Sequence, residues 1–145
     1  MLTTTSMFIT FHGRLEDSIK TFYEKLANKE RYAGVRGAFL ALAKENGEHK
    51  EMVLRVYREV ITDAFEGGFP LTNLNEEDYL LETELPDETS LSDVLKMAVE
   101  IEEKSRKFCE DTASSTKGLM ADVPQAFEWV AKRKTRRIGN LESLS

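Results

Sequence analysis

The chain contains few of the residues that cross-link small proteins or interrupt helices. Its 145 residues include one cysteine, three prolines and eight glycines. Because Cys109 is alone, the chain cannot form an intrachain disulfide or a cysteine-rich zinc or iron site. We therefore expect Cys109 to be a small core residue in a reducing environment.

Long apolar runs are also missing. The first residues, MLTTTSMFITFHGRLED, have too short an apolar run for a membrane span and no basic flank for a signal peptide. A formal net charge of -6 gives no dominant positive field, which argues against general binding to nucleic acid or to an anionic membrane. These absences predict a cytoplasmic protein without a membrane segment.

What the chain has in abundance is amphipathic helix. Charged residues make up 32% and hydrophobic residues 41% of the chain, and apolar residues recur in helical steps of three and four. This pattern predicts an all-α protein with a single domain of residues 1–145. The predicted helices cover about residues 6–28, 31–63, 90–113 and 122–143.

Connection lengths predict how these helices are joined. Residues 64–89 are too long for a tight turn and contain two glycines and two prolines, so we expect a crossover along the bundle, with one helical turn near NEEDYLL. The other two connections are short, which predicts two antiparallel helical hairpins.

Several residues predict where the helices begin. Ser90 should cap the third helix, and Asp122 should cap the fourth, with Pro124 in its first turn. Gly13 and the β-branched, aromatic residues before it disfavour a helix there, so the first helix is predicted to be regular only over Leu15–Ala27.

Polar residues interrupt the apolar seam of each predicted helix. Asn46 and His49 interrupt the second seam, Lys134 and Arg137 the fourth, and Glu102 the third. The first seam holds both His12 and Glu16.

An internal repeat relates these positions. The stretch LEDSIKTFYEKLA aligns with IEEKSRKFCEDTA, which places Glu16 against Glu102. Continuing both copies places Asn46 against Lys134, and His49 against Arg137. The alignment indicates a diverged duplication.

Two helical hairpins, a long crossover, and the motif FYEKLA…FLALAKENGEH followed by FEGGFP resemble rubrerythrin-like members of the ferritin-like superfamily. The resemblance covers nearly the whole chain. It implies a ferritin-like antiparallel four-helix bundle in which two helices each supply Glu and two each supply Glu-x-x-His. In such proteins these six side chains hold two iron ions that react with oxygen or peroxide.

The resemblance assigns these roles only in part. Glu16 and Glu102 match the single glutamates, and His49 matches the histidine of the second helix. Asn46 stands where that helix should have Glu, and Lys134 and Arg137 replace both ligands of the fourth helix. Two fixed cations can neutralise two buried carboxylates without a metal, and a guanidinium can bind one of them through two hydrogen bonds.

Other readings of the same residues remain open. Lys134 and Arg137 could extend their stems along the bundle and leave their charges in water. Alternatively, His12 or Glu48 could join Glu16, His49 and Glu102 around one iron, zinc or manganese ion. The run KRKTRR, residues 132–137, is interpreted as a partly solvated helix face plus the seam pair rather than a nucleic-acid patch.

The leading hypothesis is a non-catalytic binding, regulatory or structural module without a cofactor. The alternative is an iron oxidoreductase of the rubrerythrin or ferritin type, acting on peroxide or oxygen with the reduced ligand set. A protein partner of unknown identity is expected, and so is a homodimer. Phe8, Phe11, Phe65 and Phe69 are candidates for the dimer face.

Overall fold

A computed structural model describes residues 1–61, 72–118 and 122–145. Within these ranges the regular elements are all helical apart from one isolated β-bridge between Leu2 and Leu74. The elements are α1 (Thr5–Ala27), η1 (Glu30–Val35), α2 (Arg36–Ile61), η2 (Glu76–Tyr79), α3 (Leu91–Thr116) and α4 (Asp122–Ser143), where η denotes a 3-10 helix.

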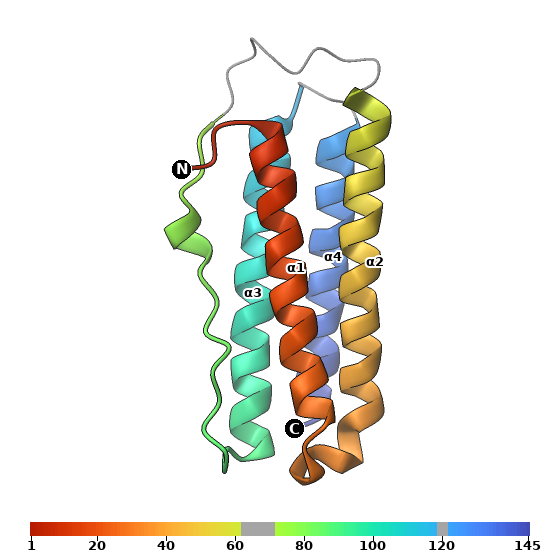
Figure 1. The fold of residues 1–145 in the computed structure, drawn as a ribbon, viewed down its shortest axis with the longest axis vertical. Coiled ribbons are helices and arrows are strands. Elements are labelled where there is room, and N and C mark those ends of the chain that lie inside the picture. Colours follow the sequence, from red (N-terminus) through yellow and green to blue (C-terminus); the bar gives the residue numbers. More distant parts are fainter. Residues whose placement is uncertain (62–71, 119–121) are drawn as a thin grey trace.

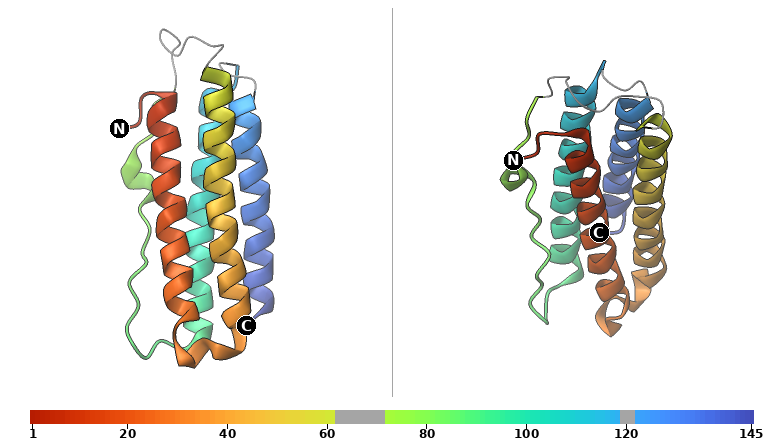
Figure 2. Two further views of the ribbon diagram at one scale, coloured as in Figure 1. Left: turned by 45° about the vertical axis from the view of Figure 1, so that its right-hand side comes forward. Right: turned by 45° about the horizontal axis from the view of Figure 1, so that its top comes forward.

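The four α-helices pack together as a bundle, as predicted (Figure 1). α1 packs most closely against α2, and α3 against α4, with further contacts between α1 and α3 and between α2 and α4. The helices run antiparallel within the pairs α1–α2 and α3–α4, whereas α2 and α3 run in the same direction. Residues 72–90 run down the outside of the bundle and include the predicted helical turn as η2. Figure 2 shows that this segment stays on the side of α1 and α3. The rest of the predicted crossover, residues 64–71, lies outside the described residues.

The first helix covers nearly the predicted residues 6–28, but it is regular over more of that range than expected. It is regular from Thr5, and the Thr4 side chain caps it by accepting a hydrogen bond from the Met7 amide. The low helix propensity of this stretch is outweighed because Phe8 and Ile9 are buried in the core. Gly13 lets the Lys50 side chain pack closely against α1, since a Cβ at residue 13 would lie only 3.3 Å from Lys50 Cε.

The predicted second helix is wrong at its start. Residues 30–35 form the 3-10 helix η1, in which Tyr32 has a non-helical backbone (φ -109°, ψ 19°). That conformation lets the Tyr32 ring pack edge-on against Phe39 and its hydroxyl donate to the Thr89 carbonyl at 2.6 Å. The end of this predicted helix, residues 62 and 63, lies outside the described residues.

The starts of α3 and α4 also test the sequence signals. Ser90 caps α3 as predicted, accepting a hydrogen bond from the Asp93 amide at 3.1 Å, and α3 continues past residue 113 to Thr116. Asp122 is the first helical residue of α4, so its predicted role as the cap is wrong by one position. Pro124 lies in the first turn, as predicted.

The bundle core contains two apolar clusters. The first surrounds Phe11, Phe108 and Phe127, near the start of α1, and the second surrounds Ile19, Phe39 and Leu141, nearer its end. Positions of the predicted helical seams contribute to both clusters, with Phe127 in the first and Ile19 and Leu141 in the second. Buried polar residues interrupt these seams between the apolar stretches.

Two further expectations are tested by burial. Phe8 and Phe11 lie inside the chain's own core, at 0% and 9% exposure, so they are not available for a dimer face. Phe65 and Phe69 fall outside the described residues.

In the described parts of the chain, no helix is both long and apolar enough to cross a membrane.

Candidate functional site

A layer of polar side chains crosses the middle of the bundle, and every helix contributes to it. It contains seven residues that the sequence singled out, each at most 2% exposed: His12, Glu16, Asn46, His49, Glu102, Lys134 and Arg137. Glu48, the other candidate ligand, is exposed and does not join them. Each occupies a seam position of its helix, so the helical period that buries the apolar residues buries these as well. We call this set the polar layer.

Glu102 of α3 is held by Arg137 of α4 through a fork of two hydrogen bonds. Arg137 Nε donates to Glu102 Oε1 at 3.0 Å, and Nη2 donates to Oε2 at 2.8 Å. The Tyr23 hydroxyl of α1 donates to the same Oε2 at 2.6 Å. Charge-assisted, two-pronged contacts of this kind are the strongest that a guanidinium makes with a carboxylate.

The remaining donors of Arg137 reach α2. Nη2 also donates to Asn46 Oδ1 at 3.0 Å, and Nη1 donates to the Leu42 carbonyl at 3.1 Å and to Glu45 Oε1 at 3.4 Å. All five N–H groups of the guanidinium therefore have acceptors. Through Arg137, α4 is fixed to α2 and α3 at one level of the bundle.

Glu16 of α1 is held differently. Lys134 Nζ lies 2.7 Å from Glu16 Oε1 and 3.6 Å from Glu102 Oε1, so the ammonium stands between the two carboxylates. Asn46 Nδ2 donates to Glu16 Oε2 at 2.9 Å. His12 Nε2 and His49 Nδ1 approach the same carboxylate at 3.5 and 3.4 Å.

Hydrogen bonding around Glu16 is incomplete. The 2.7 Å approach of Lys134 Nζ is an ion pair without hydrogen-bond angles, and His49 Nε2 has no partner among the described residues. Two hydroxyls of α3, on Ser105 and Thr112, are likewise buried without a hydrogen bond within the described ranges. A buried polar atom left unpaired costs about 1–3 kcal/mol, so the contacts around Glu16 are less completely satisfied than those around Glu102.

The electrostatics keep both carboxylates charged. Burial alone would raise the pKa of Glu16, but Lys134 and the two histidines outweigh it and hold that pKa well below its usual range. Burial opposes ionisation of Glu102 in the same way, and Lys134, Arg137 and Tyr23 together lower its pKa. Burial lowers the pKa of His49, which favours its neutral form. Two negative and two positive charges then balance within the layer.

These observations decide between the readings of Lys134 and Arg137. The idea that their charges reach water is wrong, because the side chains are 0% and 2% exposed. The run KRKTRR divides as expected, with Lys132 and Arg136 exposed and the seam pair buried.

Sequence reasoning missed Tyr23 and Glu45 as partners. Tyr23 does lie on the polar seam of the first helix, which was the available signal.

The residues present do not fit a di-iron centre. An ammonium lies between the two carboxylates, 2.7 Å from one of them, where it would oppose a metal cation electrostatically. In residues 1–61, 72–118 and 122–145, no three His, Cys, Asp or Glu side chains are placed to hold a metal ion. Cys109 is buried, and burial raises the pKa of its thiol, so it favours neither metal binding nor nucleophilic chemistry.

Comparisons with protein-family models, curated proteins and solved structures found no match to this chain.

Proposed function

We propose that this chain is a ferritin-like, rubrerythrin-like bundle in which fixed cations have replaced the metal ions, and that it acts as a non-catalytic binding, regulatory or structural module. The observation that carries this proposal is the placement of Lys134 between Glu16 and Glu102, with Arg137 forked onto Glu102. In a di-iron protein, metal cations would balance such carboxylates.

The balance of charge supports the proposal. Removing metals from a site of buried carboxylates leaves repelling anions, whereas this layer is neutral with its own side chains. A module that keeps the fold needs no electron donor and no access for oxygen. The buried, unpaired Cys109 is compatible with a cytoplasmic setting, which we include in the proposal.

Metal content tests this function. The purified chain, expressed with added iron, would be analysed by mass spectrometry for iron, zinc and manganese, and again after anaerobic incubation with ferrous ion and desalting. We expect no stoichiometric metal in either sample. Two irons per chain would overturn the proposal, and one ion that is lost in His49→Ala would favour a mononuclear oxidoreductase.

A melting experiment provides an independent readout. A metal that binds only the folded chain must stabilise it, by about 2.7 kcal/mol when the metal is at a hundredfold excess over Kd. The melting temperature would then rise. We expect no rise with ferrous, zinc or manganese ion. A rise that His49→Ala abolishes would contradict the proposal even if desalting had removed a weakly bound metal.

A further inference from the structure

A groove runs between the extended segment after η2 and the outer face of α3, on the opposite side of α3 from the polar layer. Its volume is about 380 Å³, and its floor is formed by Leu81, Met97 and Ile101. Three carboxylates line it: Glu82 from the extended segment, and Glu100 and Glu103 from α3. We call this feature the crossover groove.

Two lysines also line the groove, and each has a hydrogen-bond partner within the chain. Lys104 Nζ donates to the Leu80 carbonyl at 2.7 Å, and Lys107 Nζ pairs with Asp111 at 3.0 Å. In contrast, Glu82, Glu100 and Glu103 form no ion pair with any described residue. The groove therefore combines an apolar floor with three carboxylates outside any ion pair of the described residues, against one ammonium, that of Lys104, which is also outside one.

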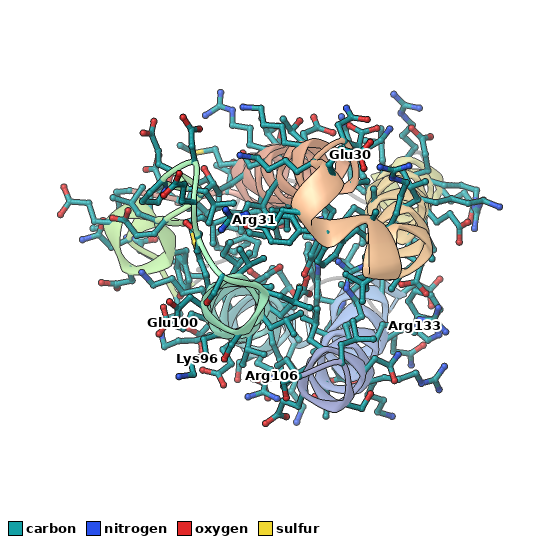
Figure 3. The ribbon with its side chains drawn as sticks, turned by 90° about the horizontal axis from the view of Figure 1, so that it is seen from below. Glu30, Arg31, Lys96, Glu100, Arg106 and Arg133 are labelled. Atoms are coloured by element: carbon teal, nitrogen blue, oxygen red, sulfur yellow. The ribbon has the colours of Figure 1, made fainter. Side chains whose placement is uncertain are left out.

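The surrounding chain extends this negative field. Residues 72–95 contain eight Asp and Glu and no Lys, Arg or His, although the whole chain has 20 Lys and Arg. Within the described crossover, these acidic side chains are mostly exposed. Figure 3 shows Glu100 on the crossover side of the bundle and Arg133 on the opposite side, by α4. An acidic segment therefore borders the groove on its crossover side.

We propose that the crossover groove docks a basic amphipathic helix from another protein. Apolar side chains of that helix would cover Leu81 and Met97, which are half-buried, while its Lys or Arg residues face Glu82, Glu100 and Glu103. A second copy of this chain placed symmetrically on the same face would oppose like charges. This proposal rests on the proposed function, because it names the class of partner that the non-catalytic module would bind.

A synthetic peptide is the direct probe. It carries Leu at helical steps of three and four and Lys elsewhere, and its binding to the whole chain is followed by fluorescence anisotropy. Two matched peptides have either Leu replaced by Gln at constant charge, or Lys replaced by Glu. We expect saturable micromolar binding of the first peptide, on the order of -8 kcal/mol, and at least tenfold weaker binding of both others.

Groove variants locate the binding site. Charge reversal with E82K, E100K and E103K should weaken binding about tenfold or more, since it replaces up to three exposed ion pairs with repulsion between like charges. Met97→Ala should weaken it about threefold by removing apolar contact. The matched control reverses three exposed acidic residues of α1 and α2 with E24K, E48K and E51K, which alter net charge equally.

Each outcome decides the proposal. Binding that falls for the groove variants and persists in the control supports it. Equal losses in both triple variants, equal binding of the Gln-substituted peptide, or no saturable binding would each overturn it. Circular dichroism establishes that every variant is folded. The result is separable from the proposed function, because metal content is measured without peptide.

Discussion

The two buried carboxylates of the polar layer are held by side chains of different kinds. Around Glu102, a guanidinium with all five donors engaged and a tyrosine hydroxyl make directed hydrogen bonds. Around Glu16, Asn46 donates the one directed hydrogen bond within the described residues, an ammonium makes a close ion pair without hydrogen-bond angles, and two histidines approach only to 3.4–3.5 Å. One half of the layer is fixed by geometry, and the other is held mainly by charge.

This difference indicates how a metal-free core can persist. A forked Arg–Glu pair specifies the positions of both helices, because a planar guanidinium accepts few arrangements. An ammonium is a compact charge that tolerates several arrangements of its neighbours. We infer that Arg137 sets the alignment of α4 with α2 and α3, while Lys134 supplies the second positive charge. The predictions below separate these roles.

Acid should lower the free energy of unfolding more than any other change, because it protonates groups in both the Glu16 half and the Glu102 half of the polar layer. Glu16 and Glu102 have pKa values below the ordinary 4.5, and His49 has one below 6.5. For all three groups, the unfolded chain binds protons more readily than the folded chain, so stability is complete above about pH 6.5 and falls as the pH drops. The loss should begin below pH 6.5 through His49 and steepen below 4.5.

Denaturant melts at a series of pH values, followed by circular dichroism, measure this loss. The matched control is the double variant Glu16→Gln with Lys134→Met, which removes one carboxylate with its main cation and should flatten the acidic limb. An unfolding free energy that stays constant from neutral pH to about pH 4 would contradict depressed carboxyl pKa values.

Arg137→Ala should have the largest effect of any single substitution in the layer. It leaves Glu102 buried without its main partner, which typically costs about 3–5 kcal/mol of unfolding free energy. The neighbouring Arg136→Ala is the matched control, since Arg136 is exposed and its removal should change stability by no more than about 0.5 kcal/mol. Similar small losses in both variants would show that the forked contact is not important for stability.

The positions in the polar layer could be predicted from the sequence because burial follows the helical period. The steps that place Ile9, Ile19 and Leu26 inside the bundle also place Glu16 inside, and the seam of α4 buries Lys134 together with Val130. The family resemblance added the expectation that carboxylates from different helices meet. Together they predicted which side chains gather in the core.

The pairing within the layer could not be predicted in the same way. Periodicity gives the face of a helix but not its axial alignment or side-chain rotamers, so the attachment of Arg137 to Glu102 and Asn46 was not specified. Tyr23 looked like an ordinary core aromatic until its hydroxyl was placed 2.6 Å from Glu102. The 3-10 helix at Tyr32 escaped prediction for a related reason, because a tertiary hydrogen bond to Thr89 fixes it.

Lys134→Met should have a smaller effect than Arg137→Ala and gives the sharpest test of the comparison. Methionine keeps most of the apolar stem and removes only the charge, whose contact with Glu16 lacks hydrogen-bond geometry. The expected cost is about 1–3 kcal/mol, since Asn46 still donates to the remaining buried carboxylate. Lys134 also contributes to the low pKa of His49, so its removal should raise that pKa.

Nuclear magnetic resonance of the His49 ring and denaturant melts measure both effects in one variant. Gly139→Ala, on the exposed face of α4, is a control that should leave the His49 titration unchanged. If Lys134→Met costs as much as Arg137→Ala and leaves the pKa of His49 in place, then the ammonium is as rigidly built into the layer as the guanidinium. If the pKa rises and the loss is small, a histidine can take over part of the positive charge. That exchange is available only where the contacts are held by charge, which is the property that distinguishes the Glu16 half from the Glu102 half.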